Sequence, residues 1–321
     1  MLEIVHLVKK FGALVAVGDV SFAVPAGQVL GFLGPNGAGK STTMKMITGF
    51  LAPTSGTAVI CGHDILREPL RAKRRIGYLP EGAPAYPAMT AAEVLRFIAH
   101  IRGLRGRVAR TRVAHIAELI NIADILHQPI ETLSKGYRRR VGVAQALLHD
   151  PAVVILDEPT DGLDPNQKHE MRGIIEAMRP EKAIIISTHL LEEVGAVCSR
   201  AIIIARGRIL ADGTPVELAA RSRYHNAVRL AMPAGADPII AGELAQLPGV
   251  RAAEPASDVE GGGWWVFPKG PAPIVAEVAE LSRRCGWTVT GLRVERGRLD
   301  DVFRAITMPE SVAPEPPRAA A

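Results

Sequence analysis

A glycine-rich segment early in the chain has the residue types and spacing that bind phosphate groups. Residues 34–41 read Gly-Pro-Asn-Gly-Ala-Gly-Lys-Ser, between a predicted strand (Val29–Leu33) and a predicted helix (40–50). Glycines let backbone N–H groups surround phosphates, while Lys40 can reach the β- and γ-phosphates and Ser41 can bind Mg²⁺. The expected phosphate-binding residues of this loop are Asn36, Gly37, Ala38, Gly39, Lys40, Ser41 and Thr42.

A pair of carboxylates ends a second apolar run. Residues 153–158 read Val-Val-Ile-Leu-Asp-Glu, which predicts a buried strand that ends at two acids. At this place Asp157 can bind Mg²⁺ directly or through water, and Glu158 can orient and deprotonate an attacking water. Taken alone, the same pattern also fits an ordinary strand end with two solvated acids.

Further short motifs surround these two segments. Residues 133–137 read Leu-Ser-Lys-Gly-Tyr at the predicted start of a helix, just ahead of the acidic strand. Phe11 lies near the N-terminus, residues 161–164 read Asp-Gly-Leu-Asp, and His189 ends the next predicted strand. In this order they resemble the signature sequence, adenine-stacking aromatic, D-loop and switch histidine of ABC ATPases. The resemblance covers residues 1–220 and implies an ATP hydrolase with a P-loop NTPase, RecA-like core.

The resemblance also implies that two copies of the chain act together. Ser134 and Gly136 start a helix, where a hydroxyl, N–H groups and the helix dipole favour a γ-phosphate. In ABC ATPases that phosphate lies on the P-loop of the opposite subunit, so two ATP molecules join two head-to-tail chains. His189 is implied to hold the γ-phosphate and to sense its loss, which makes it a catalytic residue in addition to Glu158, and Asp164 is implied to belong to the nucleotide site.

One motif departs from the usual family pattern. ABC ATPases usually carry Gln in a Tyr-x-Pro-Gln setting, whereas residues 78–81 here read Tyr-Leu-Pro-Glu. A carboxylate at Glu81 can bind Mg²⁺ and water, but without the metal it repels a triphosphate. The same variant, together with Leu-Asp-Asp-Val-Phe at residues 299–303, is similar to a bacterial export-type branch that includes gliding-motility and multidrug-export ATPases.

The pattern of strands and helices predicts an α/β core with a helical insertion. Strands alternate with turns and helices up to about residue 84, and strand–helix alternation returns at Val153. In between, Thr90 and Glu93 fit a capping box ahead of residues with helical periodicity. We therefore predict an ATPase domain over residues 1–221, with a helical subdomain over about 84–150.

A small second domain is predicted after a boundary near residues 221–225. Residues 225–307 read as strand, helix, two strands, helix, strand and a last helix, which predicts a small α+β, ferredoxin-like domain. Trp264 and Trp265 are neighbours on a predicted strand, so we expect one in the core and one covered by a neighbour. Residues 308–321 are rich in Pro and Ala and predict a disordered tail.

Composition excludes several classes of protein. The chain has 321 residues, a net charge of +5 and three widely separated cysteines, which argues against a disulfide framework or a zinc site. No apolar stretch approaches 18 residues, so the chain is not predicted to span a membrane. Arg138–Arg140 could suggest nucleic-acid binding, but three consecutive helical residues point to different faces, and we expect a solvated or intersubunit face.

The resemblance predicts an ABC transporter ATPase of the exporter type. It implies that ATP and Mg²⁺ are cofactors and that the partners are a second copy of the chain and a separate multispanning permease. The helical insertion and the loop at Glu81 would transmit motion to that permease. We expect a cytoplasmic, membrane-associated protein on the inner face of the cell membrane, with no nucleic acid partner. The alternative is a soluble ABC ATPase that acts on nucleic acid or ribosomes, although the chain has neither the long coiled coil nor the second cassette of those classes.

Overall fold

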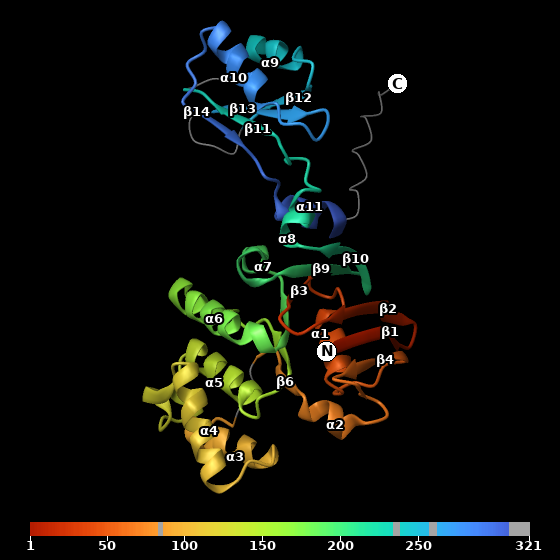
Figure 1. The fold of residues 1–321 in the computed structure, drawn as a ribbon, viewed down its shortest axis with the longest axis vertical. Coiled ribbons are helices and arrows are strands. Elements are labelled where there is room, and N and C mark those ends of the chain that lie inside the picture. The colour runs from red at the N-terminus through yellow and green to blue at the C-terminus, as the bar shows by residue number, and fades with distance from the viewer. Residues whose placement is uncertain (83–85, 234–237, 257–261, 308–321) are drawn as a thin grey trace, which may run out of the picture. The chain divides into compact units, whose positions relative to one another are not determined.

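The computed structural model describes residues 1–82, 86–233, 238–256 and 262–307 (Figure 1). The predicted tail, residues 308–321, lies outside this described part. The chain divides into two compact units, Met1–Pro215 and Val216–Ala321, each with its own sheet structure. No helix in the described ranges combines the length and the apolar character that a bilayer crossing requires.

The first unit is centred on one sheet of six strands: β3 (Val29–Leu33), β6 (Ile76–Leu79), β7 (Val153–Asp157), β8 (Ala183–Thr188), β9 (Arg200–Ala205) and β10 (Arg208–Gly213). The strand order is β10-β9-β3-β8-β7-β6, and only β10 runs antiparallel to its neighbour. Every residue of β3, β7 and β8 is buried, as expected for continuous apolar runs in a parallel sheet. Because parallel strands end at one edge, the segments that follow these three strands meet there.

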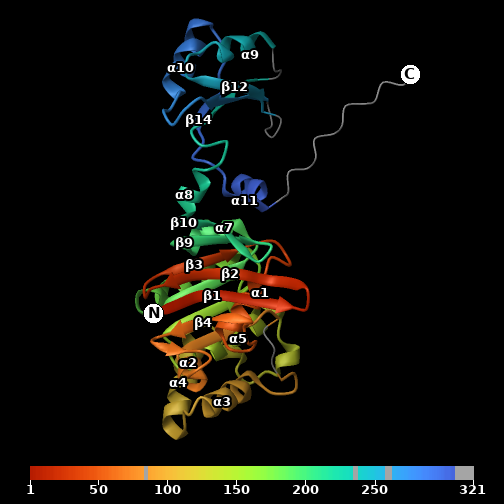
Figure 2. The same cartoon turned by 90° about the vertical axis from the view of Figure 1, so that its right-hand side faces the viewer.

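A second, antiparallel sheet covers one side of this unit (Figure 2). It contains β1 (Leu2–Phe11), β2 (Leu14–Val24), β4 (Ser55–Ile60) and β5 (His63–Asp64). Helix α1 (Lys40–Ile47) buries Met44, Met46 and Ile47 in a single core with apolar residues of both sheets. The helix that follows the glycine-rich loop is therefore fixed at its base by the main hydrophobic core.

Helices fill the segment between β6 and β7, as the sequence predicts. They are α3 (Ala91–Ile101), α4 (Gly106–Leu119) and α5 (Lys135–Leu147), with short 3₁₀ turns at Ala123–Ile125 and Ile130–Thr132. The predicted capping box is confirmed, because Thr90 Oγ1 accepts from Glu93 N at 3.3 Å and Glu93 Oε2 accepts from Thr90 N at 2.8 Å. Helices α6 (Pro165–Met178) and α7 (Leu191–Val197) follow β7 and β8, and α2 (Pro69–Arg74) precedes β6.

The second unit contains α8 (Pro215–Ala219), β11 (Val228–Ala231), α9 (Pro238–Ala245), β12 (Val250–Pro255), β13 (Gly263–Pro268), α10 (Val275–Arg284), β14 (Gly291–Val294) and α11 (Leu299–Thr307). Its sheet has the order β12-β13-β11-β14, with every neighbouring pair antiparallel. The order of elements along the chain is the expected one. The compact unit starts at Val216, a few residues before the predicted boundary. Within it, Ser222 Oγ donates to Asp301 Oδ2 of α11 at 2.7 Å.

The two adjacent tryptophans lie on opposite faces of this sheet, as expected for neighbours on a strand. Trp264 belongs to the core between the sheet and helices α9 and α10. Trp265 is buried on the other face with Phe267, and Tyr224 covers it with ring centroids 5.2 Å apart. The prediction of one core and one covered tryptophan is confirmed.

Candidate active site

The glycine-rich loop lies between β3 and α1, and its glycines are required by its geometry. Gly37 and Gly39 have φ angles of 79° and 105°, in the region that favours glycine. A Cβ on Gly34 would lie 2.4 Å from the carbonyl oxygen of Ile204. Gly39 is the N-cap of α1 and provides no side-chain cap, so the first N–H groups of α1 stay available to a ligand.

Lys40 is the first residue of α1 and is 6% exposed. Its Nζ donates to the carbonyl oxygens of Gly34 and Pro35, at 2.7 and 3.3 Å. Burial lowers the pKa of Lys40, while the carboxylates of Glu158, Asp157 and Glu81 act in the opposite direction. The ammonium therefore lies among three acids at the edge of the sheet, where it can bind phosphate oxygens.

The two acids at the end of β7 have different environments. Asp157 is 1% exposed, and within the described residues neither of its carboxylate oxygens has a hydrogen-bond partner. Buried carboxylates normally have partners, so these two oxygens fit a bound cation such as Mg²⁺. Glu158 is 12% exposed, and its Oε2 lies 2.8 Å from Nδ1 of His189 at the end of β8. Burial raises the pKa of Glu158, and His189 acts against that rise.

A hollow of 320 Å³ contains many of the residues expected to bind the nucleotide. Glu158 and Glu81 line it from the ends of β7 and β6, opposite the glycine-rich loop. Ala16 of β2 also lines it, and no motif in the sequence pointed to that residue. The remaining lining residues are Pro35, Asn36, Gly37, Gly39, Lys40, Ser41 and Thr42.

Ala38 and Phe11, both predicted to bind the nucleotide, do not line this hollow. Ala38 is buried, and its carbonyl oxygen accepts from Gly207 N at 2.9 Å, a bond that holds the loop. Nucleotide binding by Ala38 remains a prediction. Phe11 is 49% exposed at the end of β1, with Nζ of Lys9 5.1 Å from its ring centroid. An adenine-stacking role for Phe11 therefore remains a prediction.

The signature and D-loop residues also lie outside the hollow of their own chain. Ser134 is the N-cap of α5, and its Oγ accepts from Tyr137 N at 3.3 Å. Gly136 packs so closely on Gln167 that a Cβ would lie 2.5 Å from Gln167 Oε1. Asp164 is the N-cap of α6 and accepts from Gln167 N at 2.9 Å. Gln167 thus contacts both the signature turn and the end of the D-loop.

Lys135 connects the signature turn to the D-loop by an ion pair. Its Nζ lies 2.9 Å from Asp161 Oδ2, and this bond lowers the pKa of Asp161. A Cβ on Gly162 would lie 2.3 Å from that Nζ, so glycine gives the lysine chain room to cross the D-loop. Both charged side chains are more than half exposed, so the pair is accessible to water and to other molecules.

The expectation of a solvated or intersubunit face for Arg138–Arg140 is correct only for Arg138. Arg139 and Arg140 are 5% and 7% exposed. Arg139 Nη2 donates to the backbone carbonyl oxygens of Asp157 and Glu158, and Arg140 Nη2 pairs with Glu170 on α6. Arg139 and Arg140 are buried because the end of β7 and helix α6 supply oxygen acceptors for their guanidinium groups.

A buried acid on α7, Glu193, belongs to no motif in the sequence. Glu193 on α7 is 5% exposed and accepts from the hydroxyl groups of Thr160 and Thr188, the latter at 3.3 Å. Thr160 follows Glu158 by two residues and Thr188 precedes His189. No spacing or motif in the sequence indicates the contact with Thr160, which lies 33 residues before Glu193.

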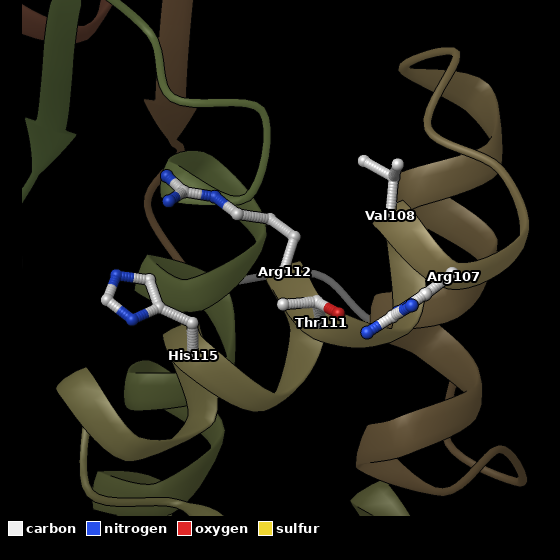
Figure 3. A pocket seen from close by; sticks show the side chains of 5 residues that line it. All are labelled: Arg107, Val108, Thr111, Arg112 and His115. Carbon is white, nitrogen blue, oxygen red and sulfur yellow. The ribbon is translucent and has the colours of Figure 1, made fainter.

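Another hollow, of 480 Å³, lies along α4 (Figure 3). Its lining consists of Arg107, Val108, Thr111, Arg112 and His115, all from one helix. Arg112 donates to the carbonyl oxygens of two residues at the end of α5, at 2.9 and 3.2 Å, and so fixes α4 to α5. None of the residues predicted to bind nucleotide or metal or to act in catalysis lines this hollow, and we assign it no ligand.

Comparison with known proteins supports one family. The ABC transporter family matches residues 17–161. The Nod factor export ATP-binding protein I of Ralstonia nicotianae is 33% identical over 314 residues, which is 96% of this chain and 94% of that protein. The probable multidrug ABC transporter ATP-binding protein YbhF of Escherichia coli is 38% identical over 224 residues, 69% of this chain. That match spans only 38% of YbhF.

Solved structures agree with this result. An ATP-binding subunit of an ABC transporter matches 68% of this chain and 91% of its own, with a TM-score of 0.63 and 31% identity. The cbiO1 protein of Clostridium perfringens matches with a TM-score of 0.62 and 28% identity, over 68% of this chain and 90% of its own. The expected α/β, P-loop core with a helical insertion is confirmed. The chain belongs to the family of ABC transporter ATP-binding proteins.

Proposed function

We propose that this chain hydrolyses ATP with Mg²⁺ and powers an exporter. The observation that carries the proposal is the 320 Å³ hollow, where the glycine-rich loop, Lys40, Glu81 and Glu158 meet. Beside them, Asp157 has a buried carboxylate with no partner among the described residues. A triphosphate supplies negative charge for the N–H groups of the loop and for Lys40, and its cation supplies positive charge for the carboxylates.

The roles of the residues follow from their chemistry. Backbone N–H groups of the loop and Lys40 hold the phosphates, and Ser41, Asp157 and Glu81 are the groups that would hold Mg²⁺. Bound Mg²⁺ supplies positive charge against the phosphate oxygens. Glu158 orients a water and accepts its proton as the oxygen attacks the γ-phosphorus and the bond to the β–γ bridging oxygen breaks. His189 holds Glu158 in place through the 2.8 Å contact, and we assign it to the γ-phosphate as the family resemblance implies.

The test compares two lysines of the same helix. Lys40→Met should abolish nucleotide binding and phosphate release from Mg·ATP. Lys45→Met removes an exposed charge one turn later on α1 and should leave both unchanged. Equal activity of the two variants would contradict the assignment of the hollow as the ATP site.

We further propose that two copies assemble head to tail. Ser134 and Gly136 have the chemistry of a γ-phosphate site, yet they do not line the hollow of their own chain. A second copy would place its signature turn on the open side of that hollow. One solved ABC cassette of the same fold, at 22% identity and a TM-score of 0.62, is described as a dimer.

We also propose a separate multispanning permease as partner, which would hold the protein at the inner face of the cell membrane. Supporting this, cbiO1 is described as part of an ABC transporter complex, and the name of the Ralstonia nicotianae protein refers to export. We propose a ferredoxin-like fold for the C-terminal unit, on the basis of its element order and its antiparallel sheet. The names of the relatives refer to different cargoes, so no cargo follows from them.

A further inference from the structure

One buried arginine joins the signature helix to the backbone of the proposed catalytic acid. Arg139 lies on α5, five residues after the N-cap Ser134, and is 5% exposed. Its Nη2 donates to the carbonyl oxygen of Asp157 at 3.3 Å and also to that of Glu158. The preceding residue, Arg138, is exposed, so only one of these two neighbouring arginines reaches β7.

The backbone that Arg139 contacts has an unusual conformation. Glu158 has a φ angle of 53°, in the left-handed region that residues other than glycine seldom adopt. Its N–H donates to the carbonyl oxygen of Ser187 at 2.8 Å, and its carboxylate contacts His189 at 2.8 Å. Glu158 is therefore held at three places: its N–H by β8, its side chain by His189 and its carbonyl oxygen by Arg139.

We propose that Arg139 is a positioning residue that couples the signature turn of a chain to the catalytic carboxylate of the same chain. This inference rests on the proposed ATPase function and on the head-to-tail dimer. In that dimer, Ser134 and Gly136 bind the nucleotide of the partner, whereas Glu158 acts on the nucleotide of its own chain. Any movement of α5 on contact with the partner's nucleotide reaches Glu158 through Arg139, so the arginine links the two ATP sites.

The chemistry of arginine suits this position. A guanidinium group is planar and offers several N–H donors, so one group can bond two successive carbonyl oxygens. Burial lowers the pKa of Arg139, and the carboxylates of Asp161, Asp157, Glu158 and Glu81 act in the opposite direction. A lysine ammonium can also bond two successive carbonyl oxygens, as Lys40 does, but its flexible chain lacks the planar group that fixes the direction of the N–H bonds of Arg139.

The test compares Arg139→Gln with Arg138→Gln, which makes the same charge change on the exposed neighbour. We expect kcat of Arg139→Gln to fall about 10- to 100-fold, since a small misplacement of a catalytic group has an effect of this size. The Kd for a fluorescent ATP analogue should stay within about twofold, because Lys40 and the glycine-rich loop are unchanged. The ATPase rate should no longer depend cooperatively on the ATP concentration. Arg138→Gln should match the wild type in all three measurements.

A second variant, Arg139→Lys, keeps the test decisive if Arg139→Gln does not fold. It keeps the charge and should recover part of the lost kcat, with its folding checked by thermal melting. The proposal is overturned if folded Arg139→Gln or Arg139→Lys has the kcat and cooperativity of the wild type. It is also overturned if nucleotide affinity falls in parallel with kcat, since that would mean a general structural role. An inactive wild-type chain would contradict the proposed function itself, which is a separate outcome.

Discussion

The glycine-rich loop and the signature turn both start helices with glycine nearby, but they differ in what their N–H groups contact. At α1 the N-cap is Gly39, which gives no side-chain cap, and the loop lines an open hollow. At α5 the hydroxyl of Ser134 already accepts from Tyr137 N, and the next residue, Lys135, is paired with Asp161. The first turn is ready for phosphate. The second already binds one N–H group, that of Tyr137, within its own chain.

In the proposed head-to-tail dimer, this difference is the reason why one chain alone would make an incomplete site. The hollow contains the groups for phosphate, metal and water activation, while the groups that would enclose the γ-phosphate lie elsewhere on the same chain. Variants in the hollow and variants at the signature turn should therefore reduce ATPase activity in different ways, and these differences test the comparison.

The largest effect on turnover is expected from Glu158→Gln, in the hollow. An amide cannot accept the proton of the attacking water, so turnover should fall about 10²- to 10⁴-fold. ATP binding should persist because Lys40, Ser41 and Asp157 remain, which a fluorescent ATP analogue can measure. Glu176→Gln, an exposed change on α6, serves as the matched control. Wild-type turnover of the Glu158 variant would remove this residue from the mechanism.

The pH dependence of turnover should follow the protonation of the same carboxylate. Burial raises the pKa of Glu158, so it takes up its proton at a higher pH than an exposed glutamate. The base is lost on protonation, and kcat should therefore decline on the acidic side at an unusually high pH. His189 favours the charged form of Glu158, so His189→Ala should move this decline to still higher pH. A decline that stays in place in the variant would contradict the contact.

A smaller effect is expected from Glu81→Gln, where the chain departs from the family pattern. Removing one negative charge beside the loop should raise the affinity for metal-free ATP about fivefold, corresponding to about 1 kcal/mol of charge repulsion in water. The Mg²⁺ concentration for half-maximal turnover should increase. Titrations in EDTA and in Mg²⁺ measure both effects, with Glu118→Gln on α4 as the control. Complete loss of ATP binding would instead indicate a structural role for Glu81.

The smallest effect is expected from removing the second unit. A chain of residues 1–215 keeps every motif of the nucleotide site and both sheets of the first unit. Its Kd for ATP should stay within about twofold of the full chain, since all groups that bind ATP remain. A chain of residues 1–221 is the comparison, because it also keeps the six residues 216–221 that belong to the second unit. An insoluble product from both would mean that the two units depend on one another to fold.

The sequence predicted the parts of the site that depend on local pattern. A glycine-rich loop between an apolar strand and a helix, or two acids after a buried strand, is fixed by neighbouring residues. The burial of Arg139 and Arg140 could not be predicted in this way. Their acceptors on β7 and α6 are 18 or more residues away, and only the folded chain brings them together.

Short elements were missed for a different reason. Helix α2 has six residues, and three of them are Arg or Lys, so it has no apolar period to reveal it. Strand β10 buries only Ala211 and is fixed by its antiparallel pairing with β9. Glu193 was missed because its burial depends on a distant hydroxyl group, that of Thr160, which lies 33 residues away in the sequence.

The most direct test of the composite site is a disulfide between two chains. The background lacks Cys61, Cys198 and Cys285 and carries Glu158→Gln to preserve the ATP-bound state. One chain receives Asn36→Cys on the glycine-rich loop, and the other receives Lys135→Cys on the signature turn. A disulfide requires Cα atoms about 4.4–6.8 Å apart, so it reports close approach of the two halves.

Mixing the two chains with ATP and a mild oxidant should give a cross-linked dimer, and omitting ATP should reduce its yield. Each variant alone should cross-link little, because it lacks the second cysteine. A chain that carries both substitutions distinguishes the two arrangements. If it closes only a bridge within itself, the loop meets its own signature turn, and the head-to-tail account is wrong.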